Sequence, residues 1–217
     1  YDVVDQSFYN NDVWFSPDGS TWAEATGAAA FSKRWNHASV VFDNKIWVIG
    51  GFDESQGAVA ADVWYSANGI IWEQATSKAE FTPRFWHTVV IFDSRMWVIG
   101  GMDDSGLGTN DVWSSTDGIT WDKVVSATGF AERFGHTSVV FDDKIWVIGG
   151  ISTSGNAFNY LNDVWYSPDG TTWVEATDAP NFSARFGHAS VVHKNIIWII
   201  GGGDENKEPM NDVWAFD

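Results

Sequence analysis

Residues 84–121 read RFWHTVVIFDSRMWVIGGMDDSGLGTNDVWSSTDGITW, and this stretch decides the fold. Two apolar runs, VVIF and MWVI, are separated by a polar turn, and the second run leads into a double glycine. An Asp-Val-Trp triplet then begins a third segment, which reaches an Asp-Gly turn and a tryptophan. Asp-Gly is a strong hairpin signal because glycine accepts the positive φ of a tight turn. The stretch therefore predicts four short antiparallel strands.

The same succession recurs along the chain. Asp-Val-Trp begins at Asp12, Asp62, Asp111, Asp163 and Asp212, at steps of 50, 49, 52 and 49 residues. An arginine three residues before a histidine recurs at Arg34, Arg84, Arg133 and Arg185, and a double glycine begins at Gly50, Gly100, Gly149 and Gly201. Such internal periodicity indicates a repeat architecture. The units cover about residues 11–33 (partial), 34–83, 84–132, 133–184 and 185–217 (partial).

The first two runs of each unit are apolar at consecutive positions, so both faces of the sheet must be covered. A two-sheet sandwich would alternate more cleanly. Four-stranded units of this length, with a double glycine ending the second strand and a tryptophan on the fourth, resemble kelch repeats. The resemblance runs from about residue 11 to 217 and implies a single all-β domain, residues 1–217, that is a β-propeller or a segment of one. Tryptophans of the second strands, Trp47, Trp97, Trp146 and Trp198, are expected to be wedged between blades.

The number of blades is open from the sequence, because the chain starts with a third strand and also ends with one. We expect about five blades, with the first and last incomplete. The alternative is a four-bladed closed ring, in which 185–202 supplies the first two strands of a blade and 11–25 the last two. Unpaired blade edges invite self-association through edge strands.

The amino-acid composition restricts the kinds of partner, the chemistry and the location that the chain can have. The formal net charge of -17 disfavours nucleic acid and anionic membranes. No apolar stretch is long enough for a transmembrane helix, and Tyr1 does not begin a signal peptide with a basic start. The chain has no cysteine, which excludes disulfides and thiolate chemistry. Acidic, tryptophan-rich and lysine-poor composition favours a secreted protein, extracellular or periplasmic.

Recognition is expected at the end of the blades where the second and third strands are joined. The joining loops, predicted at 52–61, 102–110, 151–162 and 203–211, differ in length and composition, whereas the turns at the opposite end repeat almost unchanged. Acidic loop residues would suit a cationic partner or a divalent cation, although solvated loops carry such residues by default. The candidate ligand-binding residues in these loops are Asp53, Asp103, Asp104, Phe158, Tyr160, Asp204 and Glu205.

The repeated arginines have two interpretations. A residue that recurs in every unit usually serves the blade, so each arginine is expected to pair with an Asp-Val-Trp aspartate and each histidine to pack or to bond the backbone. In several kelch proteins, however, arginines at the matching position line the partner-binding pocket. The resemblance therefore implies a second role, in which Arg34, Arg84, Arg133 and Arg185 clamp a carboxylate.

Catalysis is less favoured than binding. Some kelch-like propellers are enzymes, but the copper-radical oxidase chemistry needs a tyrosine crosslinked to a cysteine, and the chain has none. No metal-ligand spacing, phosphate loop or nucleophile elbow is present, so we predict neither cofactor nor metal. We predict a non-catalytic module that recognises a protein or glycan. The alternatives are a structural subunit that assembles through blade edges, and a sugar-modifying enzyme of the sialic acid mutarotase or lyase type.

Overall fold

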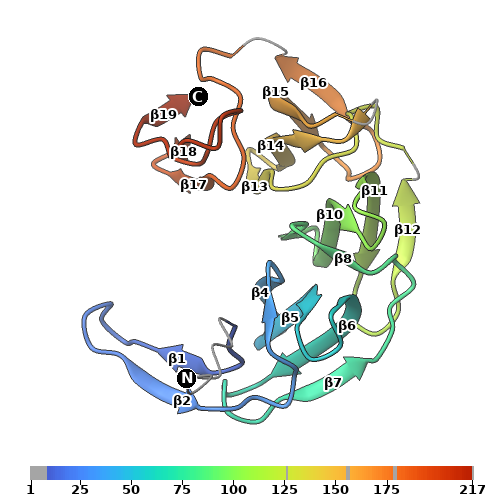
Figure 1. The fold of residues 1–217 in the computed structure, drawn as a ribbon, viewed down its shortest axis with the longest axis vertical. Coiled ribbons are helices and arrows are strands. Elements are labelled where there is room, and N and C mark those ends of the chain that lie inside the picture. Colours follow the sequence, from blue (N-terminus) through green and yellow to red (C-terminus); the bar gives the residue numbers. More distant parts are fainter. Residues whose placement is uncertain (1–8, 126, 155–156, 178–179, 217) are drawn as a thin grey trace, which may run out of the picture.

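A computed structural model describes residues 9–125, 127–154, 157–177 and 180–216 of the chain. Within these residues there are nineteen β-strands and no α-helix, which confirms the all-β class. The strands form five separate sheets, numbered here in chain order, and each repeat unit supplies one. Figure 1 shows the sheets following one another along an arc, with the first and fifth at its two ends.

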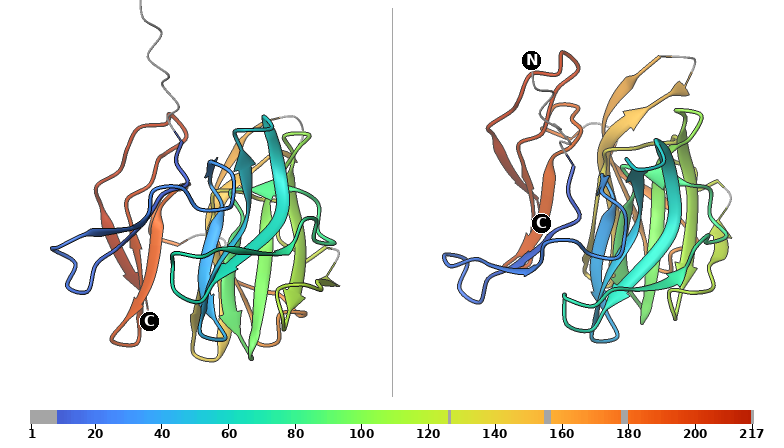
Figure 2. Two further views of the ribbon diagram at one scale, coloured as in Figure 1. Left: turned by 90° about the horizontal axis from the view of Figure 1, so that it is seen from below. Right: turned by 60° about the horizontal axis from the view of Figure 1, so that its bottom comes forward.

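The second, third and fourth sheets are complete antiparallel meanders of four main strands. The second and third have an additional two-residue strand, which pairs with the far end of the second main strand. Figure 2 shows the strands of these sheets standing side by side. The second sheet consists of β3 (Arg34–Trp35), β4 (Ala38–Phe42), β5 (Lys45–Asp53), β6 (Ala58–Ser66) and β7 (Glu73–Thr76). The third consists of β8 (Arg84–Phe85), β9 (Thr88–Phe92), β10 (Arg95–Asp103), β11 (Gly108–Ser115) and β12 (Asp122–Val125). The fourth consists of β13 (Thr137–Phe141), β14 (Lys144–Ser152), β15 (Asn159–Ser167) and β16 (Val174–Thr177).

The first and fifth sheets are incomplete. The first is the hairpin of β1 (Val13–Phe15) and β2 (Ala23–Thr26). The fifth contains β17 (Ala189–His193), β18 (Ile196–Ile200) and β19 (Val213–Phe216). Four sheets thus have three or more strands, which is the blade number of the four-bladed alternative, and the remaining unit adds only a hairpin. The five-blade prediction is confirmed in part, and among the described strands none of the first sheet pairs with one of the fifth.

The prediction that the double glycine ends the second strand is confirmed in the fifth sheet, where β18 stops at Ile200, and is wrong for the second, third and fourth sheets. In the third sheet β10 continues through Gly100 and Gly101 to Asp103, and the pairing with β11 shifts register between Ile99 and Gly101. Both glycines have positive φ, 55° and 111°, so they form a bulge inside the strand. The same shift occurs at the equivalent glycines of the second and fourth sheets. In these three sheets the joining loops are therefore shorter than predicted, and Asp53, Asp103 and Tyr160 lie in strands.

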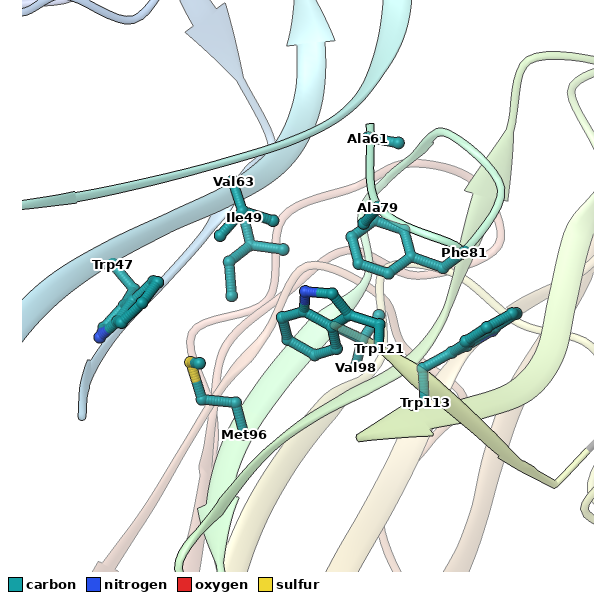
Figure 3. Packing of buried hydrophobic residues seen from close by; sticks show 10 residues of the cluster. All are labelled: Trp47, Ile49, Ala61, Val63, Ala79, Phe81, Met96, Val98, Trp113 and Trp121. Carbon is teal, nitrogen blue, oxygen red and sulfur yellow. The ribbon is translucent and has the colours of Figure 1, made fainter. Parts of the chain in front are cut away.

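The core lies between neighbouring sheets. Figure 3 shows the cluster between the second and third sheets, where the indole of Trp121 lies among residues of both. Trp121 is 2% exposed and makes an edge contact with Phe81, with ring centroids 5.3 Å apart. The prediction that second-strand tryptophans are wedged between blades is confirmed for Trp47 and Trp97, which are 2% and 4% exposed. Trp146 and Trp198 are half-buried.

Candidate functional site

Each repeated arginine is buried inside its own sheet. The Arg84 side chain is fully buried, and its two Nη atoms donate to the two carboxylate oxygens of Asp111 at 2.8 and 3.3 Å. Nη1 also donates to the carbonyl of Gly100 at 2.8 Å, and the remaining donors bond the carbonyl and hydroxyl oxygens of Thr82. The arginine therefore ties the start of the first strand to the glycine bulge and to the third strand.

The other three arginines repeat this arrangement. They pair with the Asp-Val-Trp aspartates at 2.7 to 2.8 Å: Arg34 with Asp62, Arg133 with Asp163, and Arg185 with Asp212. The same aspartates accept a hydrogen bond from the indole of the triplet's own tryptophan, as Asp111 does from Trp113 at 2.8 Å. The predicted pairing is confirmed. A ligand carboxylate would have to displace an aspartate from the buried guanidinium, so the geometry supports the role in the blade.

The ion pair fixes the charge of the aspartate. Burial alone would raise the pKa of Asp111, but the hydrogen bond and the positive charge of Arg84 outweigh burial and lower that pKa. The carboxylate consequently stays ionised at neutral pH.

The histidines explain why the double glycines accompany them. The ring of His136 lies against the first glycine of the preceding sheet, where a Cβ on Gly100 would come within 2.9 Å of the imidazole. The second glycine of the pair, Gly101, lies against the Cβ of His87 in its own sheet, at 2.7 Å from a built Cβ. The bulge thus accommodates two histidines, one on each side. The prediction that the histidines pack is confirmed for His87, His136 and His188, which are all buried.

Burial makes these imidazoles difficult to protonate. Burial, reinforced by the nearby guanidinium of each unit, lowers the pKa of His87 to about 3 and that of His188 to about 4. The pKa of His136 is lowered well below its ordinary value for the same reasons. All three are neutral in the folded protein near pH 7.

A chain of backbone hydrogen bonds connects the second, third, fourth and fifth sheets to one another. The residue before each histidine takes part: Trp86 N donates to Asn36 O, Gly135 N to Trp86 O, and Gly187 N to Gly135 O, at 2.8 to 3.1 Å. These residues all have positive φ, and Trp86 adopts 56°, an unusual value for so bulky a residue. The ring of Trp86 covers Gly135 and Gly187 and lies 6.3 Å from the ring of Phe186. The four residues and the histidines that follow them line a pocket of about 210 Å³.

The acidic candidates in the loops divide into two groups. Asp53, Asp103 and Asp204 hold the turns: each accepts hydrogen bonds from backbone amides two to four residues further on. Burial opposes ionisation of Asp53, yet hydrogen bonds from Ser55, Ser32 and Gln56 lower its pKa. Asp104 and Glu205 are exposed at the loop tips. In the described part of the chain, no three His, Cys, Asp or Glu side chains are placed to hold a metal ion.

The aromatic candidates lie at the same end of the sheets. Phe158 is 63% exposed and packs its ring edge on Phe134 at 6.1 Å. Tyr160 packs on Phe186 at 5.6 Å, linking the fourth sheet to the fifth. Phe158 also borders a pocket of about 210 Å³ together with Leu107, which is 51% exposed. We name this end of the molecule, with the loop residues 54–57, 104–107, 153–154 and 157–158, the loop face.

Sequence reasoning missed Trp86, Phe186 and Leu107. Comparison of the repeats could have found Trp86, because it stands where the other units have Asn36, Gly135 and Gly187. Leu107 is the one aliphatic side chain among the exposed residues 104–107. Nothing in the sequence distinguishes Phe186 from the aromatic residues at the same position in the other units.

Meanders packed side by side, bulged double glycines and buried Arg–Asp pairs define a kelch-repeat β-propeller. The chain belongs to the KLHDC2/KLHL20/DRC7 Kelch-repeats domain family, whose model matches residues 36–217. A solved structure described as "Structure of YjhT" superposes with a TM-score of 0.78 at 16% sequence identity, covering 95% of this chain and 72% of that one. At this identity the likeness shows the fold. No curated protein matches the chain. None of the described residues belongs to a helix long and apolar enough to cross a membrane.

One inter-sheet hydrogen bond that the repeats lead us to expect is missing. Nε2 of His136 is 3.0 Å from the hydroxyl of Thr88, and Nε2 of His188 is 2.8 Å from that of Thr137. For His87, the residue at the same position of the preceding sheet is Ala38, which has no hydroxyl. Nε2 of His87 accordingly has no partner in the described residues. Replacing Ala38 by Thr should supply the hydroxyl and raise the free energy of unfolding by about 1 kcal/mol, measured by urea denaturation.

Ala189→Thr is the matched control. Ala189 holds the same position in the fifth sheet, where no described sheet follows, so the new hydroxyl meets no histidine. An equal gain in both variants would show that β-propensity, and not the bond to His87, is responsible.

Proposed function

We propose that this chain is a non-catalytic binding module that recognises a protein partner through the loop face. The observation that carries the proposal is the apolar pocket between the third and fourth sheets, lined by Gly106, Leu107, Thr153, Ala157 and Phe158. Two large apolar side chains, Leu107 and Phe158, are more than half exposed there. Exposed apolar residues gathered on one face, from adjacent loops of a rigid scaffold, are typical of an interaction site.

The surroundings of the pocket indicate the chemistry of the partner. Asp104 precedes Leu107 in the same loop, Asp103 ends the strand before that loop, and Glu132 lies against Gly108 beside it. A segment with an apolar side chain between lysines or arginines would fill the pocket and meet these carboxylates. A glycan stacked on Phe158 is the alternative ligand. Membership of the kelch family, in which propellers act as interaction modules, favours a protein partner over a glycan.

The pocket can be tested with arrays. The purified chain should bind immobilised peptides that carry Leu, Ile or Phe flanked by Lys or Arg, and the variant Leu107→Ala/Phe158→Ala should lose at least about tenfold in affinity because it removes the apolar contacts. Its melting temperature should stay close to that of the parent, since both side chains are exposed.

Ile119→Ala is the control, because Ile119 is 54% exposed on a turn at the opposite end of the sheets. Equal loss in the control and the double variant would contradict the proposed face. If the chain bound a glycan array and no peptide, the ligand would be a carbohydrate and not a protein. The extracellular or periplasmic location is part of this proposal and can be checked by fractionating cells that express the full-length gene.

A further inference from the structure

At the first three junctions between neighbouring sheets, a tryptophan from the hairpin between the third and fourth strands fills the space. It makes an edge contact with a phenylalanine that follows the preceding sheet: Trp72 with Phe31, Trp121 with Phe81, and Trp173 with Phe130, at 5.0 to 5.3 Å. The turn glycine of the same hairpin lies against the second-strand tryptophan of the preceding sheet. A Cβ on Gly118 would overlap Trp47, and one on Gly170 would overlap Trp97.

The junction between the fourth and fifth sheets lacks such a hairpin among the described residues. Phe182 occupies the position of Phe31, Phe81 and Phe130, and Trp146 that of Trp47 and Trp97. The space between them is a groove of about 360 Å³, which is also bordered by Trp214 and Phe216 of β19. The three filled junctions show what this groove fits: an Asp-Gly hairpin that presents an indole.

The chain has one hairpin of this kind without a junction to fill. Between β1 and β2, Asp18 and Ser16 form the same hydrogen-bonded turn that Asp117 and Ser115 form in the third sheet. Its tryptophan, Trp22, is nevertheless 60% exposed, whereas Trp72 and Trp121 are 6% and 2% exposed.

The strand that precedes the turn matches the last strand of the fifth sheet. β1 follows Asn11-Asp12 and β19 follows Asn211-Asp212, and both continue Val-Trp. Asp12 accepts a hydrogen bond from Trp14 at 2.7 Å, just as Asp212 does from Trp214 at 2.6 Å. Asp212 additionally pairs with Arg185, while no ion pair to an arginine is found for Asp12 in the described chain. β1 can therefore replace β19 on β18 bond for bond.

We propose that the β1–β2 hairpin of a second copy takes the place of β19, pairing Asp12 with Arg185 and inserting Trp22 into the groove beside Phe182 and Trp146. The exchange re-forms the backbone pairing and the Arg185 ion pair that β19 makes. It gives up the contact of Phe216 with Trp146 and buries Trp22 in its place, so the indole is what favours association.

The contacts at the two ends of the chain favour a second copy over closure within one chain. The hairpin is held on the second sheet by Ala29 N to Asn11 O at 2.9 Å and by Asn11 Nδ2 to Phe31 O at 3.0 Å. The fifth sheet is held on the fourth by Gly150 N to Arg185 O at 2.9 Å. Figure 1 shows these two ends apart, so a hairpin that keeps its bonds to the second sheet meets the fifth sheet of another copy and not that of its own chain.

Engineered cysteines test the pairing, since the chain has none of its own. Val213 stands opposite Ile200 across β18 and β19, so after exchange Val13 of the other copy stands there. Mixing the Val13→Cys and Ile200→Cys proteins under oxidising conditions should give a disulfide-linked heterodimer, identified by mass spectrometry. Ile71→Cys, at a position 65% exposed on another hairpin, should not link to Ile200→Cys above background.

Sedimentation measures the contribution of the indole. Trp22→Ala should raise the dimer dissociation constant at least about tenfold, as expected for a buried aromatic anchor, and Ile71→Ala should change it less than about twofold. The proposal is overturned if the unmodified chain stays monomeric, if no heterodimer forms, or if a chain with both cysteines closes only on itself.

Discussion

Replacing Arg84 by Leu should lower the free energy of unfolding by about 3 to 5 kcal/mol, the range expected when one partner of a buried ion pair is removed. The Arg84 side chain is fully buried and the Asp111 side chain is 10% exposed, so the aspartate would lose its buried partner. Among the described residues, only the exposed Lys123 and the indole of Trp113 would remain in contact with its charge. The carbonyl of Gly100 would lose its donor as well. The change in the urea unfolding midpoint, at constant m-value, measures the loss.

A second partner of Asp111, Lys123, offers the control. Lys123 also contacts this aspartate, at 3.5 Å, but its side chain is 43% exposed. Lys123→Ala should therefore change the stability by less than about 1 kcal/mol, as for a surface pair. The double variant Arg84→Leu/Asp111→Leu should recover part of the loss, because no charge remains buried. Equal effects at Arg84 and Lys123 would show that the buried pair does not hold the blade.

The repeats made the fold and this pair predictable. The spacing of Asp-Val-Trp fixed the period, and the recurrence of one arginine and one aspartate per unit indicated their pairing before any coordinates. The prediction that the double glycine ends the second strand is confirmed in the fifth sheet and is wrong in the second, third and fourth. An apolar run followed by glycines has the same sequence whether a strand stops or bulges there. Only the neighbouring sheet's histidine, packed on Gly100, explains why the strand goes on.

The candidate site was less predictable than the fold. Asp53 and Asp103 were read as ligand candidates because they are acidic and follow the glycines, but both use their carboxylates to bond the turn. Phe158 was found because aromatic residues are conspicuous in a loop, whereas its neighbour Leu107 comes from another unit. A pocket between loops about 50 residues apart depends on how adjacent sheets pack, which the repeat period alone does not give.

The stability of the protein should fall steeply between pH 6.5 and about pH 4.5. In the unfolded chain a histidine has a pKa near 6.5, while burial and the nearby arginines lower the pKa of His87 to about 3 and that of His188 to about 4 in the fold. Between these values the unfolded chain binds protons that the folded chain does not, so the free energy of unfolding decreases as the pH falls. The stabilisation that the neutral histidines contribute is fully present above about pH 6.5.

The size of the effect follows from the same linkage. Each histidine contributes up to about 1.4 kcal/mol per pH unit below 6.5. Burial and the charge of Arg34 also lower the pKa of His37, to about 4. With His37 and His136, four groups together should therefore remove at most about 8 kcal/mol between pH 8 and pH 5, a large part of the stability of a domain. Urea denaturation at half-unit steps of pH measures the slope.

Carboxylates do not obscure this window. Asp111, Asp169 and Asp212 have pKa values lowered in the fold, so their contribution is present above about pH 4 and is lost only at lower pH. His136→Gln, which keeps a polar group near Thr88, should reduce the slope between pH 5 and 6 by about a quarter, because four histidines contribute to it. His193→Gln, at an exposed position on β17, should leave it unchanged. A profile that is flat down to pH 4.5 would mean that the buried imidazoles reach water in the folded protein, and that the sheets part at the glycine bulges more readily than their packing indicates.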